Sequence, residues 1–310
     1  LYAELGDRSG VATSLSNQGL ARHALGDPAG AAALLAQAEA IIRELELPAM
    51  LQVTLGNRAA FLLQAGDVAG AATALAEQEA ICRQTGNRVG LAACLGNQAL
   101  VAQAHGDVAR MQALLTEQER ICREVGDRPG LVNALGNLVT CAVASNDAPG
   151  ALRHLDAQLA EARQLGPEGS AAVVTNLTVQ MRMRPALGDV AGLHALLVDL
   201  EATARTGGDD AVLAQCLAIR ATMALGAGDV ASAGPLLTEA EDRARRSGNA
   251  HALQLAVGNR GLLALQQGQL DAAEPLLAEQ ERVSRAAGIP EGLSAALGNL
   301  AIVAQHRGDG

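Results

Sequence analysis

Apolar side chains recur at helical spacing in short blocks along the chain. Between Asn87 and Gly106 they stand at positions i, i+4, i+8 and i+11, namely Leu91, Leu95, Ala99 and Ala102. This spacing places them on one face of an α-helix. A similar apolar stripe follows between Asp107 and Gly126. Because glycine accepts the left-handed conformation that ends a helix and aspartate caps the next one, the pattern predicts two helices joined by short turns.

The turn that joins these two helices recurs along the whole chain as Gly-Asp or a close variant. It stands at Gly26-Asp27, Gly66-Asp67, Gly106-Asp107, Asn146-Asp147, Gly188-Asp189, Gly228-Asp229, Gly268-Gln269 and Gly308-Asp309. Each step is 40 residues, except one of 42. A fixed period of this size indicates a repeat architecture, in which each unit buries its apolar face by stacking on its neighbours.

The period predicts the fold class and the domain organisation. We expect an all-α protein, a right-handed α-solenoid of about seven and a half helix-turn-helix repeats, forming one domain over residues 1–310. The expected repeats are 7–46, 47–86, 87–126, 127–166, 167–208, 209–248, 249–288 and a partial 289–310. We expect the chain to be part of a longer protein, in which a further helix covers the apolar face of the last one.

Composition narrows the class of partner. Aromatic residues supply 1% of a chain that is 49% hydrophobic, so the core must be built from Leu, Ala and Val. The net charge is −10, and all 23 basic residues are arginine, which suggests a GC-rich bacterial genome. An acidic surface repels phosphate backbones, so we expect no nucleic-acid partner. No membrane span or signal peptide is visible, so we expect a cytoplasmic protein without a membrane partner.

The residues that usually carry chemistry show no catalytic arrangement. The five cysteines form no C-x-x-C pair, and we expect them to be small buried side chains. The histidines lack metal-ligand spacing, and phosphate-binding or nucleophile motifs are missing. We therefore expect no catalytic residues, no metal, no cofactor and no enzymatic activity.

The helix-turn-helix unit resembles the tetratricopeptide repeat (TPR) at Leu95, Ala99, Gly106, Met111 and Leu115. Its length is more similar to the 40-residue repeats of LGN/Pins and kinesin light chain. That resemblance rests on Leu15-Ser16-Asn17, Leu55-Gly56-Asn57, Leu95-Gly96-Asn97, Leu135-Gly136-Asn137, Gly258-Asn259 and Leu297-Gly298-Asn299. It implies a scaffold whose concave groove binds a protein or peptide, with the asparagines facing the groove.

Asparagine recurs at one position of the first helix of most repeats. The set is Asn17, Asn57, Asn97, Asn137, Asn176, Asn259 and Asn299, and Ile219 interrupts it. An amide both donates and accepts, so such a ladder can bind the backbone of an extended peptide, with Arg58, Gln98, Leu100 and Arg260 as groove neighbours. Alternatively, the asparagines brace neighbouring repeats. A structural role in self-association, through the exposed C-terminal helix, is the second functional hypothesis.

Two further patterns bear on the surface and on the irregular repeat. The second helices carry Glu-Gln-Glu strings such as Glu77-Gln78-Glu79, which we interpret as a solvated acidic convex face. In the fifth repeat, the stretch Met181–Pro185 contains a three-residue insertion. Proline inside a helix removes a hydrogen bond, so we expect that helix to end early or kink near Arg184.

Overall fold

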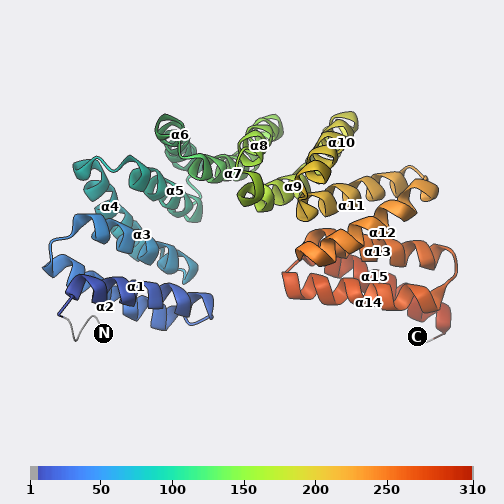
Figure 1. Ribbon diagram of the computed structural model, residues 1–310, viewed down its shortest axis with the longest axis horizontal. Coiled ribbons are helices and arrows are strands. Elements are labelled where there is room, and N and C mark those ends of the chain that lie inside the picture. The colour runs from blue at the N-terminus through green and yellow to red at the C-terminus, as the bar shows by residue number, and fades with distance from the viewer. Residues whose placement is uncertain (1–5, 309–310) are drawn as a thin grey trace. The chain divides into compact units, whose positions relative to one another are not determined.

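The computed structural model describes residues 6–308, which form fifteen α-helices and one short 3-10 helix (Figure 1). The helices are α1 Arg8–Ala24, α2 Pro28–Glu44, α3 Pro48–Gln64, α4 Val68–Thr85, α5 Arg88–Ala104, α6 Val108–Val125, α7 Arg128–Ala144, α8 Ala148–Arg163, α9 Ser170–Ala186, α10 Val190–Gly207, α11 Asp210–Gly226, α12 Val230–Ser247, α13 Ala250–Gln266, α14 Leu270–Ala287 and α15 Pro290–Arg307. The prediction of an all-α array of helical repeats is confirmed. Asp309, the last expected cap, lies outside the described residues.

The helix boundaries follow the predicted turn chemistry. The Asp107 side chain accepts a hydrogen bond from the backbone N–H of Arg110, three residues into α6. Gly126 ends the same helix with φ of 72°, in the left-handed region that glycine enters without steric cost. Where the cap is Leu47 and makes no side-chain bond, Pro48 occupies the first helical position and removes one unpaired N–H.

The contacts divide the chain into two compact units, residues 1–161 and 162–310. Within each unit, odd-numbered helices pack against even-numbered neighbours, as α5 does against α4 and α6, and α13 against α12 and α14. Odd helices also contact one another: α3 with α5, α5 with α7, α9 with α11, α11 with α13, and α13 with α15. The odd helices therefore line the inner, concave side of each unit. In the first unit, Figure 1 shows α4 and α6 outside α3 and α5. The single-domain organisation stays a prediction.

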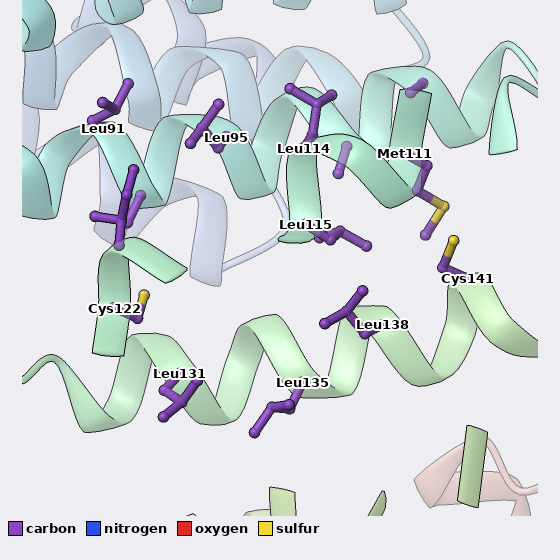
Figure 2. Packing of buried hydrophobic residues seen from close by; sticks show 14 of the residues in the cluster. Leu91, Leu95, Met111, Leu114, Leu115, Cys122, Leu131, Leu135, Leu138 and Cys141 are labelled. Atoms are coloured by element: carbon purple, nitrogen blue, oxygen red, sulfur yellow. The ribbon is translucent and has the colours of Figure 1, made fainter. Parts of the chain in front are cut away.

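The core lies between the two helix layers and is built from aliphatic side chains. Figure 2 shows one cluster, to which Leu95 of α5, Leu115 of α6 and Leu135 of α7 belong. All three are at most 1% exposed. Alanines such as Ala99 fill the closest helix contacts, as the lack of aromatic residues requires. The five cysteines are all buried and free, as expected.

The irregular repeat differs from the expectation. Helix α9 has 17 residues, the length of its counterpart α7, and it continues to Ala186 with Pro185 in its last turn. The two extra residues lie instead between α8 and α9, where Gly166–Gly169 forms the 3-10 helix. The expected early end near Arg184 was wrong because a proline in the last turn breaks few helical bonds. Arg184 itself bonds to Gln180 and Asp189.

None of the described helices combines the length and the apolar character that a membrane-spanning helix needs.

Candidate partner-binding surface

The predicted asparagines occupy one register position on the odd helices. Asn97 lies ten residues after the N-cap Asn87, and Asn57 and Asn137 stand at the same distance from Leu47 and Asp127. We call Asn17, Asn57, Asn97 and Asn137, all in the first unit, the asparagine stripe. The stripe therefore lies on the inner helices of that unit.

The asparagine stripe has free hydrogen-bonding capacity. The side chain of Asn17 is exposed, and those of Asn57, Asn97 and Asn137 are half-buried. Within residues 6–308, none of these four amides has a hydrogen-bond partner from another side chain or the backbone. Each of these helices therefore carries a side-chain amide that can still donate and accept hydrogen bonds.

Exposed aliphatic residues flank these amides. On α5, Leu100 lies three residues after Asn97 and is 39% exposed; on α1, Leu20 has the same relation to Asn17 and is 41% exposed. Val53, four residues before Asn57, is 52% exposed. The surface thus combines polar amides with apolar side chains that a bound chain would cover.

The glycine before Asn57, Asn97 and Asn137 makes room for a glutamine side chain. A Cβ atom at this position would lie 2.6 to 2.8 Å from the side-chain nitrogen of the glutamine 22 residues later. The pairs are Gly56 with Gln78, Gly96 with Gln118, and Gly136 with Gln158. Repeats without the glycine also lack the glutamine and carry Ser16 with Ala38, Thr178 with Leu200, and Ala218 with Ala240. Glycine and glutamine therefore form one packing unit beneath the stripe.

The residues that follow the ladder asparagines are held by neighbouring helices. Arg58 donates to Glu39 at 2.8 Å, and Gln98 donates to Glu79 at 2.6 Å. Arg260 makes the same contact with Glu241 in the second unit. Each glutamate stands 19 residues earlier, on the preceding even helix. These three predicted groove neighbours thus brace adjacent helices, although the two arginine side chains stay 38% and 37% exposed.

The Glu-Gln-Glu strings are not the solvated acidic face that the sequence suggested. Gln78 and Gln118 are 3% and 5% exposed. The flanking glutamates bind arginines of the neighbouring repeats: Arg43 donates to Glu77 at 2.6 Å, and Arg245 donates to Glu279 at 2.9 Å. The interpretation failed because an arginine 34 residues earlier lies beside each first glutamate once the repeats stack.

The second unit departs from the ladder. Asn176 was expected at the ladder position but lies three residues before it; Val179 occupies that position on α9. Asn176 is 1% exposed and accepts a hydrogen bond from Gln180.

Asn259 donates to Thr222 of α11 at 2.9 Å and so braces two repeats. Asn299 is half-buried on α15. With Ile219 fully buried, the ladder breaks over two consecutive repeats.

Burial keeps the cysteine thiols protonated and therefore unreactive at neutral pH. Burial raises the pKa of Cys94 to about 12, and it raises the pKa of Cys122 to about 11. In the second unit burial likewise raises the pKa of Cys216 to about 12. Because the thiolate is the reactive form, these side chains serve packing at neutral pH.

Comparisons with known proteins establish the fold. No family model and no curated protein matches the sequence. Aspartyl phosphate phosphatase F from Bacillus subtilis is similar in structure, with a TM-score of 0.57 and 10% identity over 94% of this chain and 69% of that one. A Rap protein complexed with competence and sporulation factor gives a TM-score of 0.53 and 14% identity over 94% of this chain and 74% of that one.

A third similar structure is a signal transduction ATPase with numerous domains (STAND) that carries a tetratricopeptide repeat sensor, from Pyrococcus horikoshii. The TM-score is 0.62 at 13% identity, over 97% of this chain and 45% of that chain. Identities this low concern the fold alone. The chain therefore has the fold of a TPR-like array of helical repeats.

Proposed function

We propose that this chain is a non-catalytic scaffold that binds an extended peptide, or an extended segment of a partner protein, along the asparagine stripe of its first unit. The observation that carries the proposal is the set of free amides at Asn57, Asn97 and Asn137, half-buried on the inner face without partners among the described residues.

The chemistry of this surface suits a peptide backbone. An asparagine side chain can donate to a backbone C=O and accept from a backbone N–H at once, whatever side chains the peptide carries. The exposed Val53 and Leu100 add apolar contact area beside those bonds. The acidic balance of the chain favours a neutral or basic peptide over nucleic acid.

The bracing alternative describes the second unit better. There Asn259 already bonds to Thr222, and Asn176 is buried away from the inner face. We therefore assign the peptide-binding role to the first unit. In that unit we keep Arg58 and Gln98 as groove neighbours whose primary bonds hold the helices together.

The similar folds supply support by analogy. One was solved with competence and sporulation factor bound to a Rap protein, and another is a repeat sensor within a signal transduction ATPase. We extend the proposal accordingly to a sensor region of a bacterial, cytoplasmic signalling protein with repeats of the 40-residue LGN/Pins type.

A selected peptide tests the proposal. Phage display of random peptides against the chain provides the ligand, and calorimetry measures its affinity for the wild type and for Asn97→Ala/Asn137→Ala. We expect the double variant to bind about tenfold or more weakly, because each lost hydrogen bond is worth about 1 kcal/mol. Its melting temperature should stay within a degree or so of the wild type, since neither amide has a partner to lose.

A matched control uses amides on the opposite layer. Gln37 and Gln84 are exposed on α2 and α4, outside the inner face. The variant Gln37→Ala/Gln84→Ala should bind the selected peptide like the wild type. Normal binding by the asparagine variant together with a melting temperature several degrees lower would reject the proposal and make the asparagines braces.

A further inference from the structure

The second unit holds a pocket of about 250 Å³ on its inner side. Helices α9, α11, α13, α14 and α15 all contribute to its wall. Its floor is rich in side-chain amides, from Gln215, Gln254, Asn259 and Gln280. Three of these are almost fully buried: Gln215 is 0%, Gln254 is 6% and Gln280 is 5% exposed. Gln254 and Gln280 hold the repeat positions that the buried Gln52 and Gln78 hold in the first unit, and Gln215 and Asn259 add two further amides here.

Hydrogen bonds among the floor amides leave two side-chain oxygens without a donor among the described residues. The side-chain nitrogen of Gln215 donates to Thr178 at 3.2 Å, and that of Asn259 donates to Thr222 at 2.9 Å. Gln280 Nε2 donates to Gln254 Oε1 at 3.3 Å. Gln280 Oε1 is buried and accepts no hydrogen bond from any described residue. Gln78 Oε1 and Gln118 Oε1, at the equivalent position of the first unit, are unpaired in the same way, so this oxygen belongs to the glycine–glutamine packing. The acceptor available to a ligand N–H is Asn259 Oδ1, which lies on a half-buried side chain of the pocket lining and accepts no hydrogen bond from the described residues.

An ion pair lies at the rim of the pocket. Arg182 of α9 and Glu291 of α15 both line the pocket. Arg182 Nη1 donates to Glu291 Oε1 at 2.7 Å, although 109 residues separate the two in the sequence. Their side chains are 59% and 66% exposed. An ion pair this exposed contributes little to stability, so it can open and exchange partners easily.

The rim determines the charge of a suitable ligand. A ligand with one charge would pair with either Arg182 or Glu291 and leave the other unpaired. A zwitterion replaces both partners at once, with its carboxylate on Arg182 and its ammonium group on Glu291. The exchange keeps every charge paired, and the N–H of an amide in the same ligand can reach the floor.

The volume determines the size of the ligand. A cavity of about 150 Å³ holds a benzene molecule, and pockets for drug-sized molecules span about 300 to 1,000 Å³. A pocket of about 250 Å³ lies between these sizes. We propose that it binds a small zwitterion with an amide N–H, either a dipeptide or an amino acid with a side-chain amide. This site is separate from the asparagine stripe and does not depend on the function proposed for it.

Calorimetry with defined probes tests this site on the full chain. The probes are glycylglycine, L-glutamine and L-asparagine, and the control probes are the same molecules with an acetylated amine and an amidated carboxylate. We expect saturable heat from glycylglycine or from the amide amino acids, and none from the blocked forms. Which zwitterion binds distinguishes a peptide source from a free amino acid.

Variants of the rim complete the test. We expect Arg182→Ala and Glu291→Ala each to weaken binding at least about tenfold, because each removes a hydrogen bond to a charged group. Circular dichroism should show unchanged helix content, since both side chains are exposed. Arg285→Ala is the matched control, because Arg285 forms an ion pair of the same 2.7 Å length with Glu281 elsewhere on the unit. It should bind the probe normally, as should Asn97→Ala/Asn137→Ala.

Three results would each overturn the proposal: no saturable heat from any of the zwitterions, equal binding of the blocked probes, or wild-type affinity in both rim variants. Because the peptide selected for the first unit is measured separately, failure here leaves the asparagine stripe untouched, and the reverse also holds.

Discussion

Single residues explain why glycine and asparagine stand side by side in so many repeats. Gly96 admits the buried side chain of Gln118 beneath the surface, and Asn97 next to it faces the inner side. The glycine therefore serves packing, and the asparagine remains available for binding. The pair looks like one motif in the sequence, but its two residues have separate physical causes.

The packing role of the glycine predicts that a Gly→Ala substitution raises the stability of the protein at one position and lowers it at another. Gly298→Ala on α15 should stabilise the protein by up to about 1 kcal/mol, because nothing lies within 4 Å of its new Cβ and alanine favours helix. Gly96→Ala should instead cost about 1 to 2 kcal/mol, because its Cβ would lie 2.8 Å from Gln118 Nε2. Urea unfolding measures both.

A compensating change tests the cause of that cost. Gly96→Ala/Gln118→Ala recreates the natural pair Ala218 with Ala240 and should recover most of the lost stability. If the double variant is as unstable as the sum of the two single variants, Gln118 is not what limits the space at Gly96.

At the scale of helices, arginine side chains join several even helices to the next even helix, as from α2 to α4 and from α12 to α14. Arg205 donates to Glu201 on its own helix and to Glu239 of α12, and Arg245 repeats the arrangement with Glu241 and Glu279. In both cases the arginine contacts a glutamate that lies 34 residues later, on the next even helix. Single exposed pairs contribute little, but a repeated series resists separation of the helices.

These contacts predict a pH dependence of stability. The hydrogen bond from Arg205 lowers the pKa of Glu239 below the ordinary value of 4.5. Above pH 4.5 the carboxylate is charged in both states, and the contact stabilises the folded chain in full. As pH falls below 4.5, the unfolded chain binds a proton first, so stability decreases. Urea unfolding of Glu239→Gln between pH 6 and about pH 3 should show a shallower decrease than the wild type.

Salt provides the control for this prediction. At about 1 M NaCl exposed charges are screened, so the difference between Glu239→Gln and the wild type should shrink. Parallel curves for the two proteins at low salt would show that the contact with Arg205 makes no contribution.

The sequence predicted the repeats well because caps and helical spacing are local. Asp107 and Gly126 act on their own helices, so their roles follow from adjacent residues. The role of Gln118 could not be predicted, since its partner Gly96 lies on another helix and only stacking brings them together. The register of Asn176 was missed for a related reason: the extra residues fell in the preceding loop rather than in the helix.

At the scale of the whole molecule, each helix pair depends on its neighbours to cover its apolar face. On α15, Leu297 and Ile302 are 47% and 41% exposed, whereas Val303 is 2% exposed against the α13–α14 layer. The two exposed side chains lie on a face that the described chain does not cover. An uncovered apolar face of this kind is available for contact with another copy of the chain.

Light scattering over a range of concentrations measures whether that face associates. We expect the wild type to self-associate, or α15 to exchange its amide hydrogens early, because exposed apolar patches drive association. Leu297→Glu/Ile302→Glu should remain monomeric with unchanged helix content. A strictly monomeric wild type with well-protected amides in residues 293–303 would contradict the expectation.

The claim that the asparagine stripe binds a peptide backbone is tested most directly by removing backbone N–H groups from the ligand. Each amide of the selected peptide is N-methylated in turn, and the affinity of each version is measured for the wild type and for Asn97→Ala. At the contacted amide, we expect methylation to weaken binding to the wild type by about 1 kcal/mol more than binding to the variant. Equal losses in both proteins at every position would contradict backbone recognition by Asn97.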